Sequence, residues 1–79
     1  MGRTNLDIIS DILDVCLNDA SRASVIDKTR MDHKILSPYI DSLVKNRLIA
    51  AIDSDMVTYK TTENGKDLLT MIKATHKRL

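Results

Sequence analysis

The 79-residue sequence contains neither Phe nor Trp, and its aromatic residues are limited to Tyr39 and Tyr59. Its core must therefore be built from aliphatic side chains of similar size, which favours helices packing on one another over an all-β sandwich. Glycine and proline are also scarce, at two and one residues, while 43% of the residues are hydrophobic. This composition excludes a disordered tail and predicts one folded domain over residues 1–79, too short for a large enzyme with its own substrate domain.

Long hydrophobic runs are absent as well. The first apolar stretch, residues 8–17, is interrupted by a serine and two aspartates, so it is neither a signal peptide nor a membrane span. The lone cysteine, Cys16, cannot form a disulfide within the chain, and its place on the apolar side of this stretch predicts a small buried hydrophobe. These absences predict a cytoplasmic protein that does not bind membranes.

Catalytic and ligand-binding motifs are missing too. No nucleophile is paired with a base, no glycine-rich loop is available for a nucleotide, and His33 and His76 lack the spacing of metal ligands. The acidic stripe Asp7, Asp11 and Asp14 has no histidine or cysteine to complete a ligand set. We therefore expect no enzymatic activity, no metal or other cofactor, and no small-molecule ligand.

The formal net charge is only +1, but the charges are segregated along the chain. Residues 1–19 contain one basic and four acidic residues, whereas residues 20–47 contain six basic and three acidic ones. Residues 48–63 are acidic again, and residues 64–79 are basic. A basic block in the middle of the chain is compatible with a polyanionic partner, although soluble helices also carry such charges on their solvated faces.

Helical signals occur in four segments. Residues 4–5 (Thr-Asn), followed by Asp7, are typical of a helix start, and this helix is expected to run to about residue 18. Its apolar residues cover everything but a narrow polar stripe, a face too wide for one packing partner, so we expect it to contact a second copy of the protein. A short helix is expected over residues 23–29, and a final helix over about residues 63–79.

The third helix, over about residues 33–46, has the clearest periodicity. After Asp32 as its cap, apolar residues recur at i, i+3, i+4, i+7 and i+8: Leu36, Tyr39, Ile40, Leu43 and Val44. The outer face carries the polar residues of the segment, namely His33, Lys34, Ser37, Asp41 and Lys45. Pro38 lies within the segment, so either the helix is kinked there or it begins anew with Ser37 as its cap.

Two stripes of opposite charge each lie along one face of a helix. One consists of the first-helix aspartates named above, and the other of Lys66, Lys73 and Lys77 in the last helix. Their opposite charges predict that the two helices pair, either within a subunit or across a dimer.

Two strand-like segments, residues 48–52 and 56–61, are rich in Ile, Val, Thr and Tyr and flank a turn at residues 53–55. A lone hairpin is marginal in water, so it must pack against the helices. The expected fold is therefore mainly α with a small β-hairpin, in the order α-α-α-β-β-α. This is the order of a winged helix-turn-helix, in which the third helix enters the major groove of DNA and the hairpin lies along the backbone.

Three motifs add a family resemblance to this order. Residues 36–43 read Leu-Ser-Pro-Tyr-Ile-Asp-Ser-Leu, residues 47–49 read Arg-Leu-Ile, and residues 59–66 read Tyr-Lys-Thr-Thr-Glu-Asn-Gly-Lys. They closely resemble the Leu-x-x-Tyr-Leu-x-x-Leu, Gly-Leu-Ile and Tyr-x-Leu-Thr-Glu-x-Gly-Lys motifs of a family of small archaeal winged helix-turn-helix proteins. Proteins of that family bind DNA as transcriptional regulators or chromatin-associated proteins, and they typically dimerise through the last helix. The resemblance implies a homodimeric transcriptional regulator whose partner is double-stranded DNA.

This resemblance places the expected site residues. Groove or base contacts are expected at the N-terminal end of the third helix, from His33, Lys34 and Ser37. Phosphate contacts are expected from four cations: Arg22, Lys28, Arg30 and Lys60. A dimer interface is expected from the first and last helices, through Ile8, Ile12, Val15, Leu68, Ile72 and Leu79.

Four features depart from the family pattern. Arg47 replaces the glycine after the third helix, so Asn46 is expected to take the left-handed cap conformation. Residues 23–24 (Ala-Ser) replace a Thr-Arg pair, which removes a phosphate contact unless Arg22 substitutes for it. A proline interrupts the third helix, and the hairpin tip at residues 53–55 is acidic.

The acidic tip, the acidic first helix and the near-neutral charge favour an alternative function, a winged-helix module for protein–protein contact without significant DNA affinity.

Overall fold

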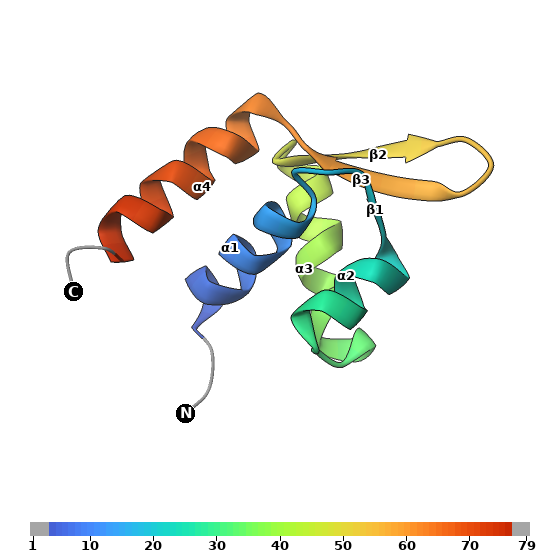
Figure 1. The fold of residues 1–79 in the computed structure, drawn as a ribbon, viewed down its shortest axis with the longest axis horizontal. Helices are drawn as coiled ribbons and strands as arrows, with labels where there is room; N and C mark the ends of the chain where they lie inside the picture. Colours follow the sequence, from blue (N-terminus) through green and yellow to red (C-terminus); the bar gives the residue numbers. More distant parts are fainter. Residues whose placement is uncertain (1–3, 77–79) are drawn as a thin grey trace.

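The computed structural model describes residues 4–76 of the chain (Figure 1). Helices and strands follow one another as α1 (Asn5–Val15), β1 (Ala20–Ser21), α2 (Arg22–Thr29), α3 (His33–Lys45), β2 (Ile49–Asp53), β3 (Val57–Thr61) and α4 (Glu63–His76). Within this range the strands form one antiparallel sheet in the order β1-β3-β2. The helices gather at one end of the molecule, and the hairpin of β2 and β3 projects away from them (Figure 1). The predicted order of helices and hairpin is confirmed, with one additional strand.

Helix starts are capped as the sequence predicts. The Thr4 hydroxyl accepts from the Asp7 amide and the Asp7 carboxylate accepts from the Thr4 amide, both at 3.1 Å. Asp32 caps α3, with its carboxylate accepting from the Lys34 amide at 3.0 Å. The Thr62 hydroxyl accepts from the third residue of the next helix in the same way and begins α4.

The connection between α1 and α2 differs from the prediction. α1 ends at Val15, slightly earlier than predicted, and the chain turns there. Residues 18–21 (Asn-Asp-Ala-Ser) have the composition of a loop, but β1 (Ala20–Ser21) pairs with Tyr59 and Thr58 of the central strand. A strand of two residues has no periodicity of its own, since it is stabilised by partners far along the chain.

The hairpin confirms the two predicted strands, with bounds shifted by a residue. β2 and β3 pair from Ile49 opposite Thr61 to Asp53 opposite Val57. Because paired residues share a face of the sheet and successive residues alternate, these four residues and Tyr59 point to the same face. The part of this face nearest the helices is buried. The outer part, toward the tip, is exposed.

Pro38 lies inside α3 without dividing it. The helix (His33–Lys45) is one element that begins after Asp32, so the alternative of a new start capped by Ser37 is wrong. Pro38 removes one amide that would have bonded to the Lys34 carbonyl, and it lies on the exposed face, where its ring meets solvent rather than the core.

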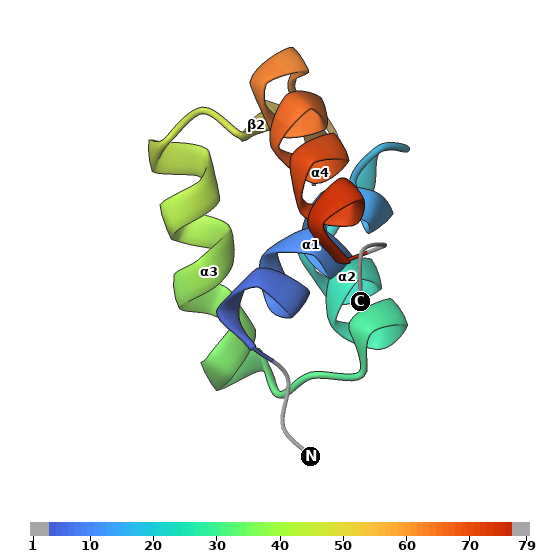
Figure 2. The same cartoon turned by 90° about the vertical axis from the view of Figure 1, so that its left-hand side faces the viewer.

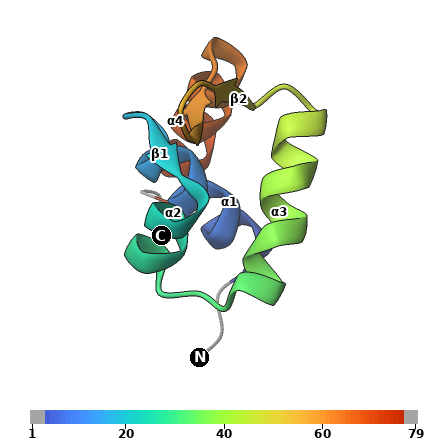
Figure 3. The same cartoon turned by 90° about the vertical axis from the view of Figure 1, so that its right-hand side faces the viewer.

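α1 runs through the centre of the helices, in contact with α2, α3 and α4 (Figure 2, Figure 3). Its residues Ile12, Leu13 and Cys16 have no exposed surface, which confirms the burial predicted for the cysteine. The rest of the hydrophobic cluster comes from one more residue of α1, Ile8, and from every other element: Ala20, Val25, Leu36, Ile40, Leu43, Ile49, Tyr59 and Leu69. The wide apolar face of α1 is therefore covered by helices of the same chain, and its width is no argument for a second copy.

Left-handed backbone occurs at Arg30, with φ of 57°, and at Arg47, with φ of 60°. The prediction for Asn46 is wrong, since its φ is −88° and its amide still bonds back into α3. The chain reverses one residue later, where the Arg47 amide donates to the Val44 carbonyl at 3.0 Å. The Thr62 hydroxyl then donates to the Arg47 carbonyl at 2.7 Å. Arg47 itself adopts the conformation for which glycine is best suited.

Candidate nucleic-acid interface

The basic block of the sequence folds into α2, a tight turn and α3 (Figure 3). Ser21 caps α2, and its hydroxyl accepts from the Ser24 amide at 3.2 Å. At the other end the Thr29 hydroxyl donates to the buried Val25 carbonyl at 2.7 Å. Arg30 then turns the chain through its left-handed conformation. These local contacts set the direction in which α3 leaves the turn.

α3 divides into a buried and an exposed face. Leu36, Ile40 and Leu43 pack into the core, as the periodicity predicts. Tyr39 donates a 2.6 Å hydrogen bond to the Asn5 side chain at the start of α1. The opposite face carries the three residues predicted to enter a groove: His33, Lys34 and Ser37. The structure thus brings these three together at the N-terminal half of α3.

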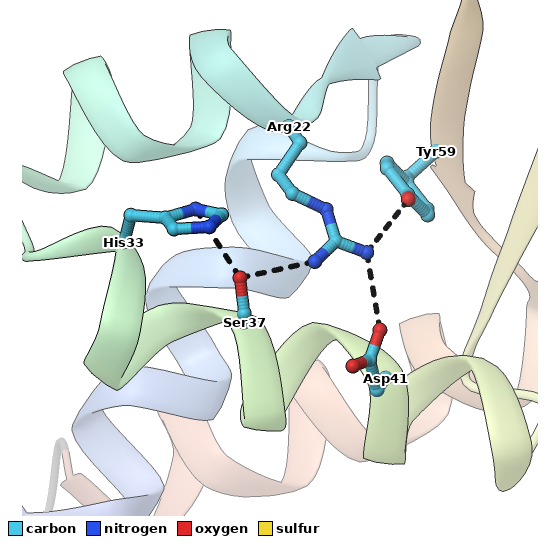
Figure 4. A network of polar contacts seen from close by, with 5 residues as sticks. All are labelled: Arg22, His33, Ser37, Asp41 and Tyr59. Atoms are coloured by element: carbon cyan, nitrogen blue, oxygen red, sulfur yellow. Dashed lines mark hydrogen bonds and ion pairs between the residues drawn. The ribbon is translucent and has the colours of Figure 1, made fainter.

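Ser37 belongs to a small polar network on this face, and Arg22 lies at the centre of that network (Figure 4). Its hydroxyl lies 3.3 Å from Nδ1 of His33, one helical turn earlier. Nη1 of Arg22 donates to the same hydroxyl at 3.0 Å. Of the three predicted groove residues, Lys34 is exposed without a side-chain partner among residues 4–76, while Ser37 is half-buried and already hydrogen-bonded.

Arg22 does not point into solvent as a phosphate contact would. Nη2 donates to Oδ1 of Asp41 and to the Tyr59 hydroxyl, each at 3.0 Å (Figure 4). The guanidinium carbon lies 5.6 Å from the centroid of the Tyr59 ring. Only 32% of the Arg22 side chain is exposed. The hydrogen bond to Tyr59 raises the pKa of Arg22 above its ordinary value, Asp41 acts in the same direction, and burial opposes both.

The other predicted phosphate contacts lie on two separate surfaces. Lys28 in the last turn of α2, Arg30 in the turn that follows and Lys34 in the first turn of α3 are exposed, and none forms an ion pair with the described part of the chain. Lys60 is exposed on β3, next to Tyr59 in sequence. Because neighbouring residues of a strand point to opposite faces, Lys60 lies on the sheet face turned away from Arg22. The structure therefore gathers three cations at the turn and leaves the fourth apart.

Comparison with known proteins decides the family. The profile of the winged helix-turn-helix family matches residues 2–79. The chain belongs to the winged helix-turn-helix family. Its β2–β3 hairpin is accordingly the wing, and α3 occupies the position of the recognition helix. A search of curated protein sequences finds no match.

Solved structures agree with this family. The winged helix is similar to Sso10a-2, a DNA-binding protein from Sulfolobus solfataricus, with 30% sequence identity and a TM-score of 0.86 over 95% of this chain and 80% of that one. This match confirms the resemblance to small archaeal winged helix-turn-helix proteins. A MarR family protein from Bacillus stearothermophilus shares the fold at 14% identity and a TM-score of 0.75, over 99% of this chain and 56% of that one. A MarR family transcriptional regulator from Silicibacter pomeroyi shares it at 12% identity and a TM-score of 0.74, over 94% and 55%. The chain thus spans little more than half the length of these two proteins.

The residues predicted for a dimer interface are divided between the core and the surface of the winged helix. Ile8, Ile12 and Ile72 are buried within the chain, so they offer almost no surface to a second copy. Val15 and Leu68 are half-buried against the core. Leu79 lies outside the described residues.

The predicted pairing of the charged stripes occurs within the subunit at one position. Nζ of Lys73 in α4 lies 3.2 Å from Oδ1 of Asp14 in α1, with both side chains half-exposed. Lys66 instead pairs with Glu63 of its own helix at 3.5 Å. Lys77 lies outside the described residues. Such exposed pairs contribute only about 0–1 kcal/mol each, so they fasten α4 weakly.

Two residues of the polar network carry no functional prediction from the sequence. The sequence predicts Asp41 only as a polar residue on the outer face of α3, and Tyr59 only as part of a family motif. Their common partner, Arg22, can be identified only in three dimensions. Within residues 4–76 no group of three or more His, Cys, Asp or Glu side chains could hold a metal ion, and no helix is long and apolar enough to cross a membrane.

Proposed function

We propose that this winged helix is a DNA-binding protein, a dimeric transcriptional regulator that places α3 in the major groove. The observation that carries the proposal is the arrangement of the α2–α3 turn. Lys28, Arg30 and Lys34 are exposed there without acidic partners in the described chain, at the end of α3 that enters the groove in this fold. Sso10a-2, a DNA-binding protein with 30% identity, supports the same function.

The exposed face of α3 supplies the contacts in the DNA groove. Lys34 donates to base edges or to phosphates, and His33 and Ser37 offer short side chains that donate or accept. The buried opposite face holds the helix rigidly, so these three groups are presented without first being ordered.

Phosphate contacts come from Lys28 and Arg30 at the turn, and from Lys60 on the wing. These contacts fix the orientation of the protein on the duplex and carry no sequence information directly. The wing face shared with Tyr59 ends in Asp53 and Val57 and has no cation among its described residues. We therefore propose that the wing approaches the backbone with its Lys60 face, and that its tip stays away from phosphate.

The proposed dimer presents two recognition helices about one DNA turn, roughly 34 Å, apart. α4 supplies the contact, because Leu68 is only half-buried and Met71, one turn along, is exposed over 66% of its surface. Leu79, another residue of the predicted interface, lies outside the described residues. Ile8, Ile12 and Ile72 are core residues, and they contribute to the proposed interface only by packing behind its surface residues.

The alternative function is a protein-contact module. It is favoured by the wing tip, where Ile52, Met56 and Val57 are exposed beside Asp53 and Asp55. An apolar and acidic tip fits a protein surface better than it fits a phosphate backbone.

The deciding experiment measures binding to random-sequence duplex DNA over a salt series. Three phosphate contacts per subunit in a dimer predict that the logarithm of the binding constant falls with the logarithm of the salt concentration with a slope of about −5. Arg30→Ala should make the slope less steep by about 2 per dimer, and Lys34→Ala should weaken binding, whereas Lys66→Ala on α4 is the matched control. Weak binding with a flat slope, unaffected by all three substitutions, would favour the protein-contact module.

Selection of a preferred duplex bound at least about a thousandfold tighter than random DNA would distinguish a regulator from a general coating protein.

A further inference from the structure

We propose that Arg22 is a positioning residue that fastens the recognition helix to the wing, and that it does not contact DNA phosphate. The inference rests on the proposed function, because it concerns how the two DNA-contacting elements are held relative to each other. It replaces the phosphate role that the basic block of the sequence suggests for this arginine.

The contacts of Arg22 join three elements. The residue is the first of α2, and its guanidinium reaches Ser37 and Asp41 on successive turns of α3 and Tyr59 on β3 (Figure 4). Ser37 and Asp41 are four residues apart, so one planar guanidinium bridges both on the same helix face. The guanidinium and its three partners therefore lie where α2, the recognition helix and the wing meet.

The same contacts use three of the five N–H donors of the Arg22 guanidinium. Both terminal nitrogens of Arg22 already donate hydrogen bonds, and the carboxylate of Asp41 neutralises the cation at 3.0 Å. A phosphate approaching this site would have to displace Asp41 and would then meet its negative charge. Arg30, by contrast, is exposed with no acidic partner in the described chain.

The wing has few other anchors of this kind. In β2 only Ile49 is buried, and the four residues after it are exposed. In β3 the buried residues are Tyr59 and Thr61, so Tyr59 is the outermost buried residue of the wing strands. A hydrogen bond at that point limits the movement of the wing relative to α3. We call the contacts of Arg22 with Ser37, Asp41 and Tyr59 the joint between α3 and the wing. Both α3 and the wing must fit the DNA surface at the same time, so a loose joint would lower the affinity without removing a contact to DNA.

The first test breaks these contacts between Arg22, the recognition helix and the wing without changing the charge that faces DNA. Tyr59→Phe removes one hydroxyl and no charge, and we expect it to weaken binding to the duplex by about 2- to 10-fold at an unchanged salt slope. Tyr39→Phe is the matched control, since that hydroxyl bonds to Asn5 in α1 and not to the wing. Binding is measured at a temperature where circular dichroism shows each variant fully folded, so that a loss of stability alone does not change it.

Asp41→Asn separates the two roles by the sign of its effect. If Arg22 contacted phosphate, removing the neighbouring negative charge would tighten DNA binding and steepen the salt slope. If Arg22 positions the helix and the wing, the loss of the ion pair weakens binding. Arg22→Gln completes the set: a slope less steep by about 2 per dimer, as expected for Arg30→Gln, together with full affinity of Tyr59→Phe, would overturn the proposal.

A measurement on the free protein keeps this proposal distinct from DNA binding. Amide hydrogen exchange of Tyr59→Phe should be faster in the wing, residues 49–61, than in the wild type, while Tyr39→Phe leaves the wing unchanged. If the wild type binds no DNA, the proposed function fails but the joint is still tested by this exchange. Unchanged exchange in the wing of Tyr59→Phe would refute the joint itself, whatever the DNA result.

Discussion

The Thr61 hydroxyl donates a 2.7 Å hydrogen bond to the Leu13 carbonyl, which joins the end of β3 to the last turn of α1. Leu13 needs this donor because the Leu17 amide, its ordinary helical partner, bonds instead to the Asp14 carbonyl. Thr61 is itself buried, so no water replaces the hydroxyl. Its amide adds a second link by donating to the Cys16 carbonyl at 2.9 Å.

Thr61→Val should therefore lower the free energy of unfolding by about 1–3 kcal/mol, because the shape is kept and a buried carbonyl loses its donor. Urea unfolding followed by circular dichroism measures this change. Thr70→Val is the matched control, since the Thr70 hydroxyl bonds to the Lys66 carbonyl on the exposed side of α4. A loss for Thr61→Val no larger than for Thr70→Val would contradict the link.

Gly65 lies where the first turn of α4 passes over the connection between α3 and β2. A β-carbon on Gly65 would overlap the Leu48 carbonyl oxygen and crowd the Thr61 methyl group. The Leu48 carbonyl is held in place, because it accepts from the Thr62 amide at 3.0 Å. Gly65→Ala should cost about 3 kcal/mol or more, measured by thermal unfolding. Asn64→Ala, at the exposed neighbouring position, should change stability by less than about 0.5 kcal/mol, and equal effects of the two would refute the close approach.

Local signals explain why most of the fold was predictable. The spacing of Leu36, Ile40 and Leu43 defines the buried face of α3, and Asp32 marks its start. β1 has no such signal, because a two-residue strand depends on its pairing with β3. The width of the apolar face of α1 was visible in the sequence, but what covers that face depends on how three helices pack, and this is a tertiary property.

The candidate site was predictable only in part, for the same reason. A basic residue in a basic block has the same local sequence whether it faces solvent or a carboxylate. Arg22 lies 19 residues from Asp41 and 37 from Tyr59, and no periodicity relates positions that far apart. The exposed cations at the turn follow from the helix boundaries, whereas the inward direction of Arg22 follows from the docking of the wing.

Arg47 offers a test of the backbone at the end of α3. Its left-handed conformation strains any residue with a β-carbon, so Arg47→Gly should raise the free energy of unfolding by about 0.5–1 kcal/mol. Asn46→Gly is the matched comparison: Asn46 has an ordinary φ, and its side chain donates to the Ser42 carbonyl at 2.8 Å. That substitution should destabilise the protein. Chemical denaturation of both variants measures the difference, and stabilisation by Asn46→Gly rather than Arg47→Gly would place the reversal one residue earlier.

Cys16 links stability to alkaline pH. Burial raises the pKa of its thiol from 9.0 to about 11, because the thiolate is poorly solvated in the core. The stabilisation of the neutral thiol is complete below the unfolded pKa and is lost as the pH rises through the folded one. Relative to Cys16→Ala, the wild type should lose about 2–3 kcal/mol of unfolding free energy between pH 9 and 11, measured by urea unfolding at each pH. The two proteins share every other ionisable group, so the comparison isolates the thiol. Parallel pH profiles of the two proteins, or rapid labelling of Cys16 by a thiol reagent in the native state, would show that the thiol is accessible to water.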